Sequence, residues 1–154
     1  MQPAMMSPAR PRSFRRILQS IAVLAFVGAL VSSVSLYHHY GTSATTYCDI
    51  GENFNCDIVN RSRFSEIAGV PVAVIGIIGY LAVLTLATLY RNQAGTPAVL
   101  AMGSLAGLGF ALYLTYVEGF VLAAWCVLCL SSLALTASVA VLSWVLWMRA
   151  RRPD

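Results

Sequence analysis

The sequence predicts an all-α membrane protein in which four transmembrane helices form one bundle. Of its 154 residues, 58% are hydrophobic and 10% are charged, whereas an average soluble domain has about 25% charged residues. Four uncharged apolar runs cover residues 17–36, 70–90, 98–117 and 122–147. Each run has the roughly 20 residues that a helix needs to cross about 30 Å of hydrocarbon. An even number of crossings leaves both ends of the chain on one side of the membrane.

Residues 1–16 precede the first run and form a basic segment that we expect to be a cytoplasmic tail. A basic start before an apolar run is also typical of a secretory signal peptide. The apolar part of such a peptide has about 7 to 15 residues and precedes an A-x-A cleavage site. This run is longer and no clear site follows it, so we expect it to stay in the protein as the first helix of the bundle.

One long and two short connections join the four runs. Residues 37–69 form the long connection, a turn at Arg91 joins the second run to the third, and a turn at Glu118 joins the third to the fourth. Residues 149–154 follow as a second expected cytoplasmic tail. The chain shows no internal repeat and no second domain, so residues 17–148 are predicted to form a single transmembrane domain.

The arginines predict the orientation of the bundle. Eight of the ten lie before the first run, between the second and third runs, or after the fourth. The positive-inside rule assigns that side to the cytoplasm. The opposite side holds the long loop, in which four acidic residues outnumber two arginines. The net charge of +4 therefore reflects membrane topology, and nothing in the sequence favours a nucleic-acid partner.

All four cysteines fall on the predicted outer side. Cys48 and Cys56 lie in the long loop, and Cys126 and Cys129 form a C-x-x-C motif at the start of the fourth run. The loop pair alone would fit a structural disulfide, and the C-x-x-C pair alone would fit two small buried side chains. Four cysteines also suit zinc, although one ligand would then point into the membrane. Their gathering at one membrane face, where an oxidising compartment permits disulfides, favours a relay between two dithiols.

The C-x-x-C spacing predicts different surroundings for its two thiols. The fourth helix is expected to run from outside to inside, so Cys129 lies about 4.5 Å deeper than Cys126 at a rise of about 1.5 Å per residue. Cys126 then meets the aqueous loop, while Cys129 faces the membrane interior. The amino end of a helix also favours the thiolate, which is the form that attacks a disulfide.

These motifs resemble those of the vitamin K epoxide reductase family, most of all its bacterial members without a fused thioredoxin-like domain. The resemblance rests on the C-x7-C pair of the loop, on Ser62 six residues after Cys56, on GVPVAVIGIIGY and on WCVLC, and it extends over roughly residues 15–148. The DsbB family performs similar chemistry with four spans but has its C-x-x-C motif in the first outer loop. The reversed order in this chain argues against DsbB.

The resemblance implies a four-helix bundle around a quinone, ubiquinone or menaquinone, with a short helix of the extracytoplasmic loop capping the quinone pocket. It implies an enzyme of the inner (plasma) membrane with its cysteines on the periplasmic side. There the loop pair would reoxidise a separate thioredoxin-like protein similar to DsbA and pass the electrons through Cys126 to Cys129, which abuts the quinone. We expect Cys48 to face the partner and Cys56 to reach Cys126. The resulting function is that of a thiol oxidase that supports disulfide bond formation.

Three further residues are candidates for the quinone pocket. Ser62 matches the loop serine or threonine of the family, although a helix-capping hydroxyl would explain it as well. Trp125 and Phe120 lie near the C-x-x-C motif and are expected to line the pocket, although an aromatic belt at the membrane surface is an alternative. Glu118 would suit proton uptake by the reduced quinone, but a solvated turn residue is the expectation.

Two other functions stay open. Animal members reduce vitamin K quinone and its epoxide with a Tyr four residues after the second C-x-x-C cysteine, where this chain has Leu133. Their Asn ahead of the second-span Gly has no match in GVPVAVIG, so plain quinone reduction is favoured. The other alternative is a membrane scaffold with structural disulfides. We predict no metal site, because His38 and His39 at the end of a span are typical of a membrane interface, and no glycan at Asn60, because its loop must lie against the bundle.

Overall fold

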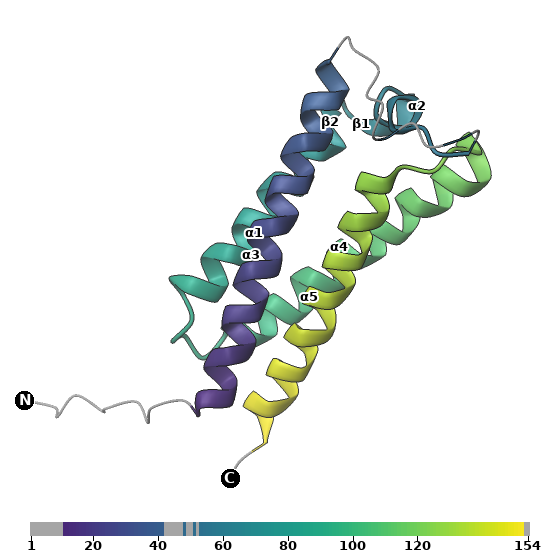
Figure 1. Ribbon diagram of the computed structural model, residues 1–154. Helices are drawn as coiled ribbons and strands as arrows, with labels where there is room; N and C mark the ends of the chain where they lie inside the picture. The colour runs from purple at the N-terminus through teal and green to yellow at the C-terminus, as the bar shows by residue number, and fades with distance from the viewer. Residues whose placement is uncertain (1–10, 42–47, 49–50, 52, 153–154) are drawn as a thin grey trace, which may run out of the picture.

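Four long helices dominate the computed structural model, which describes residues 11–41, 48, 51 and 53–152 (Figure 1). They are α1 (Arg12–Tyr40), α3 (Val72–Thr88), α4 (Thr96–Tyr116) and α5 (Val127–Arg151). The segment between α1 and α3 contains a short helix, a 3-10 turn and a two-stranded antiparallel ribbon. These small elements are α2 (Cys56–Asn60), η1 (Arg63–Ser65), β1 (Glu66–Ile67) and β2 (Val70–Pro71). A π-helical turn, η2 (Val117–Leu122), continues α4.

Three helices in the described part of the chain are long and apolar enough to cross a membrane. They are α1, α4 together with η2, and α5. Helix α3 is apolar but has only 17 residues. The predicted class, an all-α membrane protein, is therefore supported, whereas the fourth crossing stays a prediction.

One helix boundary near the cysteines, the start of α5, differs from the predicted run. We expected the last span to begin at Leu122, but this residue ends η2 and the helix begins at Val127. The break occurs at Ala123, whose φ of 49° is left-handed and incompatible with a continuing helix. Cys126 consequently lies just before α5 as its N-cap residue, between the helix and the loop.

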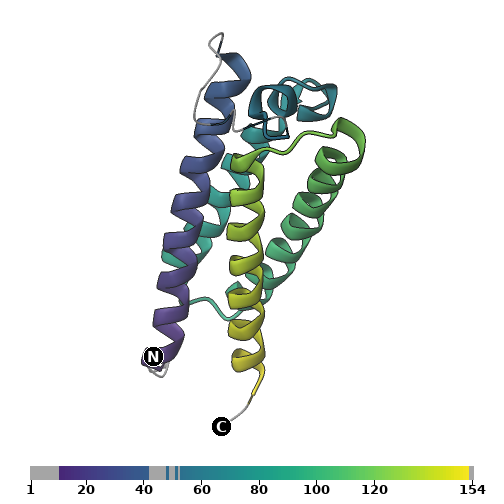
Figure 2. The same ribbon diagram turned by 45° about the vertical axis from the view of Figure 1, so that its right-hand side comes forward.

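The long helices pack as two pairs that meet along α1 and α5. Helix α1 contacts α3 and α5, and α4 contacts α5. Figures 1 and 2 show that the start of α1 and the end of α5 lie at one end of the bundle, whereas α2, the β ribbon and the end of α4 lie at the other. Both described ends of the chain are therefore remote from the cysteines.

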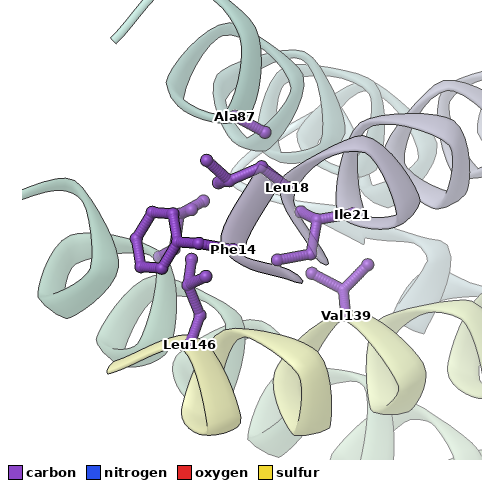
Figure 3. Packing of buried hydrophobic residues seen from close by; sticks show 7 residues of the cluster. Phe14, Leu18, Ile21, Ala87, Val139 and Leu146 are labelled. Atoms are coloured by element: carbon purple, nitrogen blue, oxygen red, sulfur yellow. The ribbon is translucent and has the colours of Figure 1, made fainter. Parts of the chain in front are cut away.

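Apolar side chains close the bundle at the end near the chain termini. Phe14, Leu18 and Ile21 lie on one face of α1 and are at most 6% exposed. They pack against side chains of the other three long helices (Figure 3). Those partners are Ala87, Leu100, Val139 and Leu146. These contacts hold the four long helices together at the end of the bundle near the chain termini.

Gly28 allows α3 to lie close to α1, because the ring of Tyr80 occupies the space where a Cβ atom would be. The Tyr80 hydroxyl in turn lies 3.0 Å from the main-chain oxygen of Ser132 and 2.8 Å from the Thr136 hydroxyl, both in α5. Gly28→Ala is expected to displace the ring and break these hydrogen bonds, which lowers the free energy of unfolding by about 1 to 3 kcal/mol. The melting temperature in detergent measures this loss.

Gly109→Ala is the matched control, because a Cβ atom there meets nothing within 4 Å. It should leave the melting temperature unchanged or raise it slightly, since Ala favours a helix more than Gly does. Equal melting temperatures for Gly28→Ala and Gly109→Ala would contradict the close packing of Tyr80 on α1.

Candidate active site

Three cysteine sulfurs meet at the end of the bundle opposite the chain termini. Cys48 and Cys56 form a disulfide, and the sulfurs of Cys48, Cys56 and Cys126 all lie within 4.8 Å of one another. Cys48 is 3%, Cys56 1% and Cys126 0% exposed. The predicted gathering of the loop pair and the C-x-x-C motif is therefore confirmed for Cys126, which lies within reach of both loop sulfurs.

Backbone pairing between the loop and the segment before α5 brings these sulfurs together. The Asn55 N–H donates to the Trp125 carbonyl at 3.0 Å, and the Trp125 N–H donates to the Asn53 carbonyl at 2.9 Å. Cys56 follows Asn55 directly and Cys126 follows Trp125 directly, so this short parallel bridge sets the two cysteines beside each other. The Asn55 side chain also accepts the N–H of Ile58 at 3.0 Å and thereby caps α2.

The two thiols of the C-x-x-C motif have different surroundings. Cys126 precedes α5 and is fully buried, whereas Cys129 is the third residue of the helix and is partly exposed. The hydrogen bond from the Cys129 thiol lowers the pKa of the Cys126 thiol, against the opposite effect of burial. Cys126 is therefore the thiol of this motif that is favoured to become a thiolate, as we expected for the helix start.

Glu118 links the two cysteines of the motif. Its Oε2 accepts the N–H of Cys126 at 3.2 Å, and its carboxylate is also hydrogen-bonded to the Cys129 thiol. The single hydrogen of the Cys129 thiol can be donated either to Glu118 or to Cys126. Glu118 is 2% exposed, so the expectation that it is a solvated turn residue is wrong.

A signal in the sequence points to Glu118. It is the only acidic residue between Glu66 and the C-terminal Asp154, and it belongs to a candidate span, Thr96–Leu122. An ionisable residue in such a segment is usually functional. The π-helical turn that contains it is also a type of structure often found at functional sites.

A mainly apolar cavity of about 270 Å³ begins at Cys129 and Glu118. Residues of all four long helices, of α2 and of the η1 turn line it. Its polar lining includes Asn60, Ser62 and Tyr80. An apolar cavity with a few polar groups is the usual form of a small-molecule site, and this one connects directly to the inner thiol of the motif.

The family model described as "Vitamin K epoxide reductase family" matches residues 19–144. The chain belongs to this family. Members are oxidoreductases that couple disulfide chemistry to quinones in membranes. The Cys48–Cys56 disulfide and the nearby Cys126 fit this family function.

The structure brings two of the four predicted quinone contacts to the cavity. Cys129 and Ser62 line it. Phe120 is 78% exposed and stacks on Tyr116 with ring centroids 4.9 Å apart. Trp125 packs over Gly119. Neither aromatic residue lines the cavity, so the cavity supports no quinone contact by Phe120 or Trp125.

Ser62 occupies the N-cap position of η1, but its hydroxyl makes no capping hydrogen bond. It donates instead to the main-chain oxygen of Val59 at 2.9 Å, which ties the end of α2 to the following turn. The structure therefore disfavours the capping alternative and places Ser62 in the wall of the cavity. A direct role for Ser62 in this vitamin K epoxide reductase homologue stays a prediction.

Two groups that were considered for metal binding have other partners. The His39 ring contacts the main-chain oxygen of Asn60 through Nδ1 and Glu66 through Nε2, the latter at 3.1 Å. His38 is buried, with 2% of its surface exposed. The close group of three sulfurs excludes Cys129, so the described residues do not assemble the zinc site of four cysteines that we weighed.

Proposed function

We propose that the protein is a membrane thiol oxidase. It reoxidises a separate periplasmic thioredoxin-like protein, similar to DsbA, and passes the electrons to a membrane quinone, which supports disulfide bond formation. One observation carries the proposal: the loop disulfide and Cys126 lie within 4.8 Å of one another, while Cys129, one turn away, lines an apolar cavity. This arrangement suits electron transfer from an aqueous dithiol to an acceptor inside the membrane.

The proposed relay consists of successive thiol–disulfide exchanges. A partner thiolate attacks Cys48, and the second partner thiol completes exchange, so that the partner gains a disulfide and the loop pair becomes a dithiol. Cys56 then attacks Cys126 of an oxidised C-x-x-C pair and releases Cys129 as a thiolate. Attack of Cys48 on Cys56 resolves the mixed disulfide. The resulting state, a loop disulfide with free Cys126 and Cys129, is the state described.

Glu118 is suited to handle the proton of Cys129 in this relay. Its carboxylate accepts the Cys126 N–H and is also hydrogen-bonded to the Cys129 thiol. As Cys129 is reoxidised, its proton moves to a Glu118 oxygen. The buried position of Glu118 keeps this transfer away from bulk water, and its place on the cavity wall makes the proton available there.

The cavity suits the quinone that the family uses. A bound ubiquinone or menaquinone would accept two electrons and two protons. The apolar walls fit a ring with a hydrocarbon tail. The buried Asn60 amide on the wall has an N–H donor without a partner among the described residues, which fits a ligand with carbonyl oxygens. Cys129 and Ser62, the two predicted contacts that line the cavity, are the residues that we expect to lie next to it.

The membrane arrangement forms part of the proposal. A helix of 17 residues such as α3 is at the lower limit of about 17 to 25 residues for a crossing, so we infer that α3 spans the membrane as the fourth helix. Arginines lie at the start of α1 and in the last turn of α5. Figure 1 shows these two helix ends at the end of the bundle opposite α2, which begins at Cys56. We therefore infer that both termini are cytoplasmic and that the cysteines face the periplasm of a bacterial inner membrane.

Purified protein in detergent, a reduced DsbA-like protein and a short-chain quinone are sufficient to test this function. Loss of the oxidised quinone absorbance should require the reduced partner and should cease in Cys126→Ala, which cannot receive electrons from the loop pair. Folded wild-type protein that turns over neither ubiquinone nor menaquinone analogues would contradict the proposal and favour a scaffold with structural disulfides.

A further inference from the structure

Asn60, the last residue of α2, has a buried side chain with one uncommitted donor. Its Oδ1 accepts the Ser35 hydroxyl at 2.8 Å, and its main-chain oxygen contacts the His39 ring. The side-chain Nδ2 is buried and has no hydrogen-bond partner among the residues that the structure describes. Asn60 is 6% exposed, so bulk solvent reaches little of its side chain.

The position of Asn60 suggests what its free donor is for. Three buried side-chain atoms of the described residues lack a partner, namely Asp57 Oδ1, Asn60 Nδ2 and Ser143 Oγ. Of these three residues, only Asn60 lines the cavity. Unsatisfied buried polar groups are uncommon in folded proteins, and a ligand is one of the partners that removes the deficit.

Neighbouring polar groups on the cavity wall already use their hydrogens within the protein. The Ser62 hydroxyl donates to Val59, and the Tyr80 hydroxyl lies within hydrogen-bond distance of the Ser132 carbonyl. Both His39 ring nitrogens contact oxygens of the protein. Asn60 therefore differs from these three side chains in presenting an N–H that no described group accepts.

We propose that Asn60 Nδ2 donates a hydrogen bond to a carbonyl oxygen of the quinone and thereby positions the quinone ring in the cavity that Cys129 also lines. The inference rests on the proposed function and assigns a specific contact to it. The donor comes from the loop helix next to the disulfide, so the same short helix carries Cys56 at its first residue and the quinone contact at its last.

The Ser35–Asn60 pair also suits the reduced ligand. A serine hydroxyl both donates and accepts, and an amide carries a donor and an acceptor on opposite sides. With Oδ1 on Ser35, the amide offers an N–H to a quinone carbonyl. If the amide group rotates by about 180°, its Oδ1 accepts the hydrogen of a hydroquinone hydroxyl while Nδ2 donates to the Ser35 hydroxyl. A single residue pair can therefore bind both redox forms.

Infrared difference spectra of a short-chain ubiquinone with ¹³C-labelled carbonyl groups test this contact directly. Hydrogen bonding lowers the stretching frequency of a carbonyl group, so the bound label should absorb at lower frequency in wild-type protein than free in detergent. Asn60→Leu, which has similar size and no donor, should return the label to the free frequency. It should also raise the dissociation constant about tenfold, the factor for one lost hydrogen bond.

Ile58→Ala is the matched control, because it changes a side chain of the same short helix that is 52% exposed and does not line the cavity. It should keep both the lowered frequency and the affinity. Asn60→Ala provides a second variant if the leucine disturbs packing, and it should behave as Asn60→Leu does.

An unchanged frequency and affinity in both Asn60 variants would overturn the inference while quinone turnover by the wild type left the proposed function standing. A wild-type protein that binds no quinone would overturn both. Loss of the frequency shift in Ile58→Ala as well as in Asn60→Leu would also count against a direct contact, because it would assign the effect to the loop helix as a whole.

Discussion

Cys129→Ala is expected to abolish catalytic quinone reduction while the protein still oxidises about one equivalent of its partner. The loop disulfide does not depend on Cys129, so a reduced partner can still exchange with the Cys48–Cys56 pair once. Without Cys129 the C-x-x-C motif cannot form its own disulfide, and no thiol of the motif remains on the cavity wall. Quinone absorbance should therefore stay constant after mixing, and thiol titration of the partner should show a single stoichiometric oxidation.

Ser131→Ala is a suitable control for this variant. Ser131 lies in the same helix, and its hydroxyl donates to the Val127 carbonyl at 2.7 Å. It does not line the cavity. We expect full turnover in this control. Repeated turnover in Cys129→Ala would contradict the assignment of Cys129 as the thiol next to the quinone and would require another route from the loop disulfide to the acceptor.

Glu118→Gln is expected to slow quinone reduction by about 10² to 10⁴, the usual contribution of a positioned base. The glutamine side chain keeps an oxygen that can accept the Cys126 N–H, so the start of α5 should stay in place. It cannot take up the proton of the Cys129 thiol. Steady-state quinone absorbance measures the loss, and a rapid-mixing measurement of a single partner exchange should show that the loop disulfide still reacts at the wild-type rate.

Glu118→Ala separates the two tasks of this residue. It removes both the proton acceptor and the acceptor of the Cys126 N–H, so we expect it to lower the melting temperature as well as turnover. If Glu118→Gln turned over quinone at the wild-type rate while Glu118→Ala did not, Glu118 would serve only to position Cys126, and the proposed proton transfer would be wrong.

The gathering of the cysteines at one end of the bundle could be predicted from the sequence, because apolar runs and arginines indicate which segments share a membrane face. The specific contact between the loop pair and Cys126 was implied by the family resemblance. The C-x7-C and C-x-x-C spacings identified the cysteines, and the positions of the apolar runs assigned them to one side of the membrane. The details of α5 could not be obtained in the same way. Residues 122–126 are as apolar as the helix that follows. The left-handed backbone conformation of Ala123, which ends η2 before α5 begins, cannot be predicted from such a composition.

The direction of a side chain is the second property that the sequence did not reveal. Phe120 and Trp125 lie near the motif in sequence, but nearness does not determine whether a ring turns toward a cavity. Glu118 was expected in solvent because a turn usually is solvated. The π-helical continuation of α4 instead buries it where its carboxylate accepts the Cys126 N–H. The sequence indicates only a glycosylation sequon at Asn60. The proposed role of Asn60 depends on its Nδ2 having no hydrogen-bond partner among the described residues, and no sequence pattern predicts this.

The parallel bridge between the loop and Trp125 has a kinetic consequence. Reacting groups that are held together in one molecule behave as if each were present at very high concentration around the other, and the entropy of their encounter is lost during folding rather than in each cycle. Exchange between the loop pair and Cys126 should then be fast compared with the arrival of a new partner molecule. This internal exchange would then not limit the cycle, and the overall rate would be set by the two steps that involve a second molecule, the arrival of reduced partner and the reduction of the quinone.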